Sequence, residues 1–159
     1  MQIRTGNHQD LPFIKRMLYE AFFWNPEIPR PSMDDFFRSG EIKKLLANWG
    51  RPGYRAIIAE IDKKPVGAAW FRLWTESDHS YGFIHPDIPE LGMAIVGEYR
   101  TRGYGRKLLK KLIDLADEDG YVALSLSVDP ANFARKLYES EGFVKVDESG
   151  TSWTYKLER

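Results

Sequence analysis

The segment Arg100-Thr101-Arg102-Gly103-Tyr104-Gly105-Arg106 has the composition of a phosphate-binding loop. It joins an apolar run typical of a strand to an amphipathic run typical of a helix. A helix N-terminus presents unbonded backbone N–H groups and the positive end of the helix dipole, and both attract a pyrophosphate. Gly103 and Gly105 permit a sharp turn and a close approach of the backbone to phosphate, and the three arginines add charge-assisted donors. The sequence therefore predicts a pyrophosphate site at this junction.

A plain turn before a helix is the simplest alternative for this segment. Two other phosphate motifs do not fit. A Walker loop needs Gly-Lys-Ser/Thr, which is absent, and a dinucleotide fingerprint needs a small residue where Leu108 stands. The lysines further along the helix are expected on a solvated face, where Lys110 would pair with Asp114 and Lys111 with Asp117.

The elements that must position this loop alternate between strand and helix periodicity, with turns marked by Gly, Pro and polar residues. The expected strands are 2–6, 54–61, 66–74, 91–96, 122–128, 143–146 and 152–157. The expected helices are 10–22, 34–49 with a break near Gly40, 103–119 and 129–142. This order, β-α-α-β-β-β-α-β-α-β-β, predicts one α/β domain over residues 1–159, with helices on a mixed, mostly antiparallel sheet.

The composition argues against several classes of protein. The chain has no cysteine, which excludes disulfides, thiolate nucleophiles and thiolate-bound metals. Its 23 basic and 23 acidic residues give a formal net charge of zero, which disfavours nucleic acid or a membrane surface as a partner. No apolar run approaches the roughly 20 residues that span a bilayer, and the N-terminus turns polar at once. We therefore expect a cytoplasmic protein.

Two blocks of the sequence resemble the GNAT superfamily of N-acetyltransferases. In the loop, Arg100, Gly103 and Gly105 match the family's acetyl-CoA signature, which is Arg/Gln-x-x-Gly-x-Gly/Ala after a strand. The segment 132–143 is similar to the family's second block, an Asn followed by Ala-x-x-Leu-Tyr-x-x-x-Gly-Phe. The order of elements agrees along the whole chain. The resemblance implies an acetyltransferase domain over residues 1–159 that transfers an acetyl group from acetyl-CoA to a primary amine, without a metal ion.

The resemblance also implies how acetyl-CoA would bind. The strand residues Met93, Ala94 and Ile95 would splay from the strand at 124–128, and the pantetheine arm would bond to backbone in that gap. Asn132 would contact the pantetheine or the adenosine side. It stands six residues before Tyr138, where many members place it seven before, a shift of about 100° on a helix. The pyrophosphate would bind to the backbone amides of Thr101, Arg102, Gly103, Tyr104, Gly105 and Arg106.

Attack of a neutral amine on a thioester needs a base, stabilisation of an oxyanion, and an acid for the departing thiolate. The resemblance places Tyr138 near the sulfur as the candidate acid, with a reference pKa near 10. The alternative for this residue is a core aromatic beside Leu137. Glu90, at the start of the central strand, is the candidate base. Further options for the base are Glu20, Glu27, Asp78, His79, His85 and Asp87, and the two histidines fit no established metal-ligand spacing.

The acceptor is expected over the loop at 22–26 and the polar loop at 75–89, because long loops are often functional. The aromatic residues that could line this side, or else pack in the core, are Trp70, Phe71, Trp74, Tyr81 and Phe83. The sequence does not distinguish a small-molecule amine from a peptide amine, and it leaves open a homodimer through the C-terminal strands. Two competing functions are a non-catalytic acyl-CoA sensor and a nucleotide binder. Thiol release and thermal shifts with CoA, ATP or NAD separate them from an acyltransferase.

Overall fold

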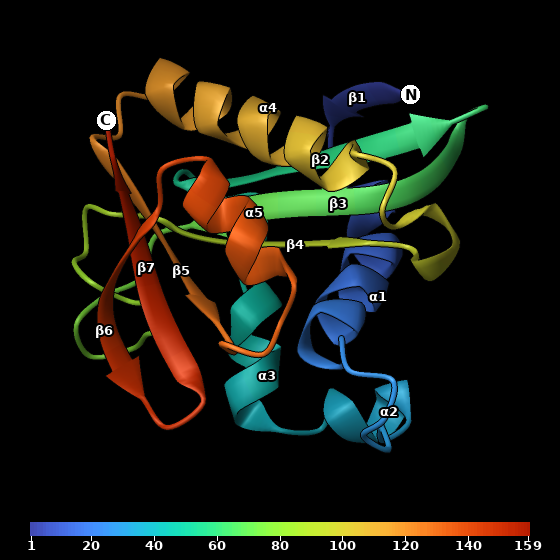
Figure 1. Ribbon diagram of the computed structural model, residues 1–159, viewed down its shortest axis with the longest axis horizontal. Helices are drawn as coiled ribbons and strands as arrows, with labels where there is room; N and C mark the ends of the chain where they lie inside the picture. Colours follow the sequence, from blue (N-terminus) through green and yellow to red (C-terminus); the bar gives the residue numbers. More distant parts are fainter.

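Seven strands form one sheet in the computed structural model, which describes all 159 residues (Figure 1). In chain order the strands are β1 (Gln2–Thr5), β2 (Tyr54–Ile61), β3 (Lys64–Arg72), β4 (Glu90–Ile95), β5 (Ala123–Val128), β6 (Val144–Ser149) and β7 (Ser152–Glu158). Their order in the sheet is β1-β2-β3-β4-β5-β7-β6. Only β4 and β5 pair in parallel. The mixed, mostly antiparallel sheet predicted from the sequence is confirmed.

Helices cover both faces of this sheet (Figure 1). They are α1 (Leu11–Phe22), α2 (Met33–Phe36), α3 (Gly40–Leu46), α4 (Tyr104–Glu118) and α5 (Ala134–Ser140), with short 3-10 turns at His8–Asp10 and Gly97–Tyr99. We call the face that α4 and α5 cover the α4 face, and the face that α1 and α3 cover the α1 face. None of the helices has both the length and the apolar character required to cross a membrane.

Alternating side chains along β4 supply a core on each face. Leu91 and Ile95 belong to the larger core on the α4 face, whereas Ala94 belongs to the core under α1. This alternation follows from the two-residue period of a strand. The alternation assigns each residue of β4 to one face of the sheet. Glu90 lies an even number of residues from Ala94, so its side chain is on the α1 face.

The helices that flank the site differ from the expected ones in two places. The predicted helix 34–49 is divided into α2 and α3, with the break near Gly40 as expected. The predicted start of the last helix at residue 129 is wrong, because α5 begins at Ala134. The side chains of Asp129 and Asn132 accept hydrogen bonds from the amides of Ala131 (2.8 Å) and Ala134 (3.0 Å). Such side-chain turns satisfy the backbone without a helix.

Strands β4 and β5 separate almost as soon as they meet. Their only paired residues are Glu90 and Ser125, next to the bond from the Ser125 amide to the Pro89 carbonyl (2.9 Å). Beyond this point the strands diverge, as Figure 1 shows. The splayed pair expected from the family resemblance is therefore present, and it leaves a gap in the middle of the sheet.

Candidate active site

Two residues with positive φ build the junction between β4 and α4. Gly103, the residue before the first turn of α4, has φ 83°, and Thr101 has φ 63°. The left-handed conformation costs an L-residue roughly 1–2 kcal/mol but costs glycine almost nothing. A Cβ at Gly103 would meet no atom within 4 Å, so backbone conformation and not space requires glycine there. Turns of this kind arrange successive N–H groups into an anion-binding concavity.

The backbone N–H groups from Thr101 to Arg106 donate no hydrogen bond. The nearest bonded amides are those of Arg100, which donates to the Gly97 carbonyl (3.3 Å), and Lys107, which donates to the Gly103 carbonyl (3.3 Å). The first turn of α4 carries no acidic residue that would neutralise its dipole. Six adjacent free donors at a helix N-terminus favour an anion site over a plain, fully bonded turn.

The three arginine side chains of the loop are not equally free. Arg106 pairs with Glu141 (2.7 Å) and donates to Ser140 Oγ (2.9 Å), which ties α4 to the end of α5. Arg100 donates through Nε to the Ile95 carbonyl (3.0 Å). Arg102 is exposed and lacks an ion-pair partner. Arg106 is therefore engaged within the protein, and the contact of the three guanidinium groups with phosphate stays a prediction.

The lysines of α4 also differ from the expected pairing. Lys110 pairs with Glu141 (3.2 Å), and Asp117 pairs with Arg159 (2.9 Å). Neither pair expected within α4 is present, because Lys110 and Asp117 pair with groups from distant segments instead. Glu141 thus pairs with two cations of α4, Arg106 and Lys110.

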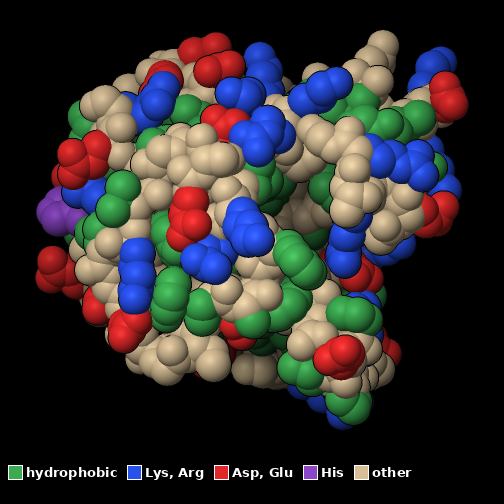
Figure 2. All heavy atoms as spheres, in the orientation of Figure 1, with side chains coloured by type: hydrophobic (Ala, Val, Ile, Leu, Met, Phe, Trp, Pro, Cys, Tyr) green, Lys and Arg blue, Asp and Glu red, His purple; other side chains and the backbone are tan.

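The gap between β4 and β5 leads from the phosphate loop toward Glu90. The Val96 amide bonds to β3 (2.8 Å), so alternation turns the backbone groups of Ala94 toward β3 and those of Met93 and Ile95 toward the gap. A Cβ on Gly105 would lie 3.6 Å from both Met93 and Leu137, so these two side chains lie against the first turn of α4. Figure 2 shows a hollow between α5 and the N-terminal end of α4, with Lys and Arg side chains on its rim.

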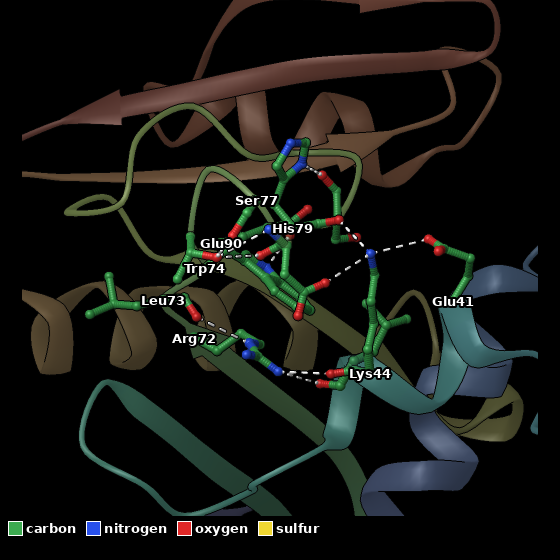
Figure 3. A network of polar contacts seen from close by, with 12 residues as sticks. Glu41, Lys44, Arg72, Leu73, Trp74, Ser77, His79 and Glu90 are labelled. Atoms are coloured by element: carbon green, nitrogen blue, oxygen red, sulfur yellow. Dashed lines mark hydrogen bonds and ion pairs between the residues drawn. The ribbon is translucent and has the colours of Figure 1, made fainter.

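Glu90 lies half-buried at the narrow end of this gap. Its Oε1 accepts the indole N–H of Trp74 (2.8 Å), and its Oε2 accepts the amide N–H of Gly82 (2.7 Å) (Figure 3). Gly82 is tightly enclosed, since a Cβ there would lie 2.4 Å from Oε2. Burial outweighs these two hydrogen bonds and raises the pKa of Glu90 to about 7. A carboxyl group with this pKa can accept a proton near neutral pH.

The other candidate bases lie in less suitable surroundings. Glu20 and Asp78 are held in ion pairs with basic side chains at 3.1 Å and 3.4 Å. His79 stacks on Phe83 with ring centroids 4.3 Å apart. The remaining candidates are exposed: Glu27, His85 and Asp87. No group of three or more His, Asp or Glu residues is arranged to hold a metal ion.

Tyr138 belongs to the core on the α4 face. Its side chain is 6% exposed and packs edge-on against Phe143, with ring centroids 5.8 Å apart. Its hydroxyl makes no hydrogen bond within the protein, and burial raises its pKa above the ordinary value. The phenol therefore stays protonated at neutral pH and has donor capacity to spare.

Asn132 uses part of its side chain locally. Its Oδ1 accepts the Ala134 amide, which leaves the side-chain NH₂ as the group that remains for a ligand. Among the aromatic residues considered for the acceptor side, Phe71 is fully buried in the α4-face core and Trp70 lies in the α1-face core. Of that set, Trp74 alone forms a hydrogen bond with Glu90.

Sequence reasoning missed the two residues that donate hydrogen bonds to Glu90, Trp74 and Gly82, and also Arg72, whose guanidinium stacks on Trp74. Trp74 was considered only as a lining residue, and Gly82 and Arg72 were not considered as parts of a site. Gly82 carried a weak signal as a glycine in a long polar loop, and Arg72 as a charge in an apolar strand. Neither signal shows that these residues converge on Glu90, because that depends on tertiary packing.

Comparison with known proteins agrees with this geometry. The family model described as Acetyltransferase (GNAT) family matches residues 13–143. The L-amino acid N-acyltransferase MnaT of Escherichia coli is 29% identical over 150 residues, which cover 91% of this chain and 80% of that protein. The [ribosomal protein bS18]-alanine N-acetyltransferase of Haemophilus influenzae is 46% identical over 55 residues, or 35% of this chain and 38% of that protein.

Solved structures share the whole fold. The PaiA N-acetyltransferase of Thermoplasma acidophilum, in complex with coenzyme A, superposes with a TM-score of 0.74 at 17% identity, covering 99% of this chain and 98% of that one. YncA of Salmonella typhimurium, with acetyl-CoA, gives 0.68 at 24% identity, covering 99% and 93%. The chain belongs to the GNAT family of acetyltransferases. It is an N-acetyltransferase.

Proposed function

We propose that this enzyme acetylates the primary amine of an amino acid or a peptide by direct attack on acetyl-CoA. The observation that carries the proposal is the carboxyl group of Glu90, which has a pKa of about 7 and lies where β4 leaves β5. Free backbone donors at the other end of β4 complement a pyrophosphate, so donor and base are placed along one strand.

The donor would bind in the gap of the sheet. The six free amides from Thr101 to Arg106 would hold the pyrophosphate, and the backbone groups of Met93 and Ile95 would bond to the pantetheine arm. Ala94 would contribute to this strand without a backbone bond to the cofactor, because its groups face β3. Asn132 would contact the cofactor through its side-chain NH₂ at the opposite border.

The acid and the base would act from opposite faces of the sheet. Glu90 lies on the α1 face and Tyr138 lies in the α4-face core, with the gap between them. The amine nitrogen attacks the thioester carbon, and its proton passes to Glu90 directly or through water. The tetrahedral oxyanion collapses, the C–S bond breaks, and Tyr138 donates its proton to the thiolate. Backbone N–H groups of β4 that face the gap would stabilise the oxyanion.

The acceptor would approach from the α1 face. A hollow there lies between α3, the 75–89 loop and the β6–β7 turn, and is lined by Glu41, Lys44, His79, Ser80, Tyr81 and Ser149. These side chains are mostly polar and of both charges, which suits an acceptor with polar groups beside its amine. The names of the Escherichia coli and Haemophilus influenzae relatives, which refer to L-amino acids and to a protein alanine, support an α-amine.

A thiol-release assay tests the proposal. Acetyl-CoA is offered with the L-amino acids, with short peptides of varied N-terminal residue, and with polyamines as a panel of non-α-amines. We expect turnover with one of the first two groups and negligible turnover with polyamines. Coenzyme A binding without turnover on any amine would contradict the proposed reaction, and failure to bind at millimolar concentration would contradict the donor site.

A further inference from the structure

Arg72 and Glu90 face each other across strands but do not form an ion pair. They are directly opposed in the antiparallel register of β3 and β4, so both side chains leave the same face of the sheet. Opposed positions have Cβ atoms roughly 5 Å apart, well within reach of an arginine. Arg72 is 6% exposed, and no carboxylate oxygen lies within 4 Å of its guanidinium. A buried cation beside a half-buried carboxyl group is thus turned away from it.

The partners of Arg72 explain this orientation. Its NH1 donates to the carbonyl oxygens of Lys44 (2.9 Å) and Leu45 (3.5 Å), in the last turn of α3, and its Nε donates to the Leu73 carbonyl (3.2 Å) (Figure 3). The last carbonyls of a helix lack partners within the helix and form the negative end of its dipole. They receive the charge that would otherwise pair with Glu90.

The guanidinium plane also supports the indole that bonds to Glu90. Its Cζ lies 3.6 Å from the centre of the Trp74 ring, and the ring of Tyr54 lies on Arg72 at 5.1 Å. Stacking at 3.6 Å restricts the rotation of the indole, whose N–H then meets Glu90 Oε1 at 2.8 Å. Arg72 therefore touches Trp74, and Trp74 touches the carboxyl group.

We propose that Arg72 is a positioning residue, which α3 holds away from Glu90 and which orients Trp74 so that the indole donates to the catalytic carboxylate. This inference rests on the proposed role of Glu90 as the base. If Arg72 were to swing onto Glu90, the direct ion pair would stabilise the carboxylate and weaken it as a base at neutral pH. With Arg72 held by α3, Glu90 keeps the hydrogen bond from Trp74 and forms no ion pair with Arg72.

The second donor to Glu90 is connected to the same turn of α3. Lys44 donates through Nζ to the His79 carbonyl (2.8 Å) and pairs with Asp78 (3.4 Å), which fixes the 75–89 loop. That loop carries Gly82, whose amide bonds to Glu90 Oε2. The carbonyl oxygen of Lys44 thus holds Arg72, which stacks on Trp74. The ammonium group of Lys44 holds the loop that carries Gly82.

The charged groups around Glu90 determine the expected direction of change. Arg72 on β3 and His79 in the loop lower the pKa of Glu90, and burial raises it. Lys44 on α3 is occupied by Glu41 and Asp78. Removal of the Arg72 plane would loosen the Trp74 hydrogen bond and remove a nearby cation, and both changes raise the pKa of Glu90. The acidic limb of the activity profile would then move to higher pH.

The test compares Arg72→Lys and Arg72→Met with Arg55→Lys, a control on the adjacent strand whose arginine pairs with Asp119 away from the site. The measurement is kcat/KM against pH at saturating acetyl-CoA. We expect Arg72→Lys to shift the acidic limb up by about one pH unit, a roughly tenfold loss at pH 6, because a hydrogen bond to a charged group is lost. Arg72→Met should shift the limb at least as far, because it also removes the cation. The melting temperature checks folding, and Arg72→Met avoids a buried unpaired charge if the lysine variant does not fold.

A double-mutant cycle with Trp74→Phe tests whether Arg72 acts through the indole. If it does, the shifts of Arg72→Met and Trp74→Phe will not add in the double variant. Additive shifts, or a wild-type profile for Arg72→Lys, would overturn the inference, because charge alone would then suffice. The variant Glu90→Gln distinguishes a failure of the proposed base from a failure of the inference about Arg72. If the acidic limb persists in Glu90→Gln, the proposed role of Glu90 as the base is refuted. If the limb is lost in Glu90→Gln but the Arg72 variants keep the wild-type pH profile, only the inference about Arg72 is refuted.

Discussion

The two ends of β4 carry sites of opposite construction. At the C-terminal end, the phosphate loop offers main-chain donors from six consecutive residues, and the nearby guanidinium groups are largely engaged elsewhere. At the N-terminal end, Glu90 is held by Trp74 and Gly82, which lie 16 and 8 residues away in the chain. A site made of consecutive backbone groups depends on local conformation, whereas a site made of converging side chains depends on the whole fold.

The largest effect is expected at the side-chain end. Glu90→Gln removes the base and keeps one of the two hydrogen-bond acceptors that receive Trp74 and Gly82. We expect kcat/KM to fall roughly 10²–10³-fold with little change in the Kd for coenzyme A. In the wild type the carboxyl group must be unprotonated to act, so activity should rise with pH through about 7 and fall below it. That limb should vanish in the variant. Glu118→Gln, an exposed position on α4, is the matched control.

The role of Tyr138 as the acid can likewise be tested separately from its effect on cofactor binding. Tyr138→Phe keeps the ring against Phe143 and removes only a hydroxyl that has no partner in the protein. We expect kcat to fall roughly 10²-fold with an unchanged Kd for acetyl-CoA, and a stable fold because no internal hydrogen bond is lost. An unaltered kcat would assign Tyr138 to the core and remove it from the reaction.

The contrast between the two ends also explains what the sequence could predict. The strand-turn-helix order around Gly103 was visible because glycines and an amphipathic run are local signals, and the splay at Met93 followed from the family resemblance. The order of the strands along the chain was also predicted correctly, because strand periodicity and turn residues are local signals. The start of α5 was misplaced because the side chains of Asp129 and Asn132 compete with the helix for backbone amides. Arg72 was missed because its partners lie in α3, 27 and 28 residues away.

The backbone character of the loop can be tested with a pair of glycines. Gly103→Val forces a β-branched residue into φ 83°, and we expect a loss of coenzyme A affinity of roughly tenfold from the conformational cost. Gly97→Ala is the control, since Gly97 has no positive φ and a Cβ there would meet no atom within 4 Å. Calorimetric titration measures both. Equal affinities for the two variants would mean that the geometry at residue 103 is not needed to hold the phosphates.

The smallest effect is expected from the arginine side chains of the loop, and it sharpens the same contrast. Arg102→Ala should weaken coenzyme A binding only about threefold, because an exposed charge contributes at most about 1 kcal/mol, and the difference should shrink as salt is added. Arg106→Ala should leave the Kd nearly unchanged and lower the melting temperature, since its guanidinium binds Glu141 and Ser140. If instead Arg106→Ala costs more affinity than Arg102→Ala, the side chain must leave α5 when the cofactor binds. The loop would then be a side-chain site like the one around Glu90.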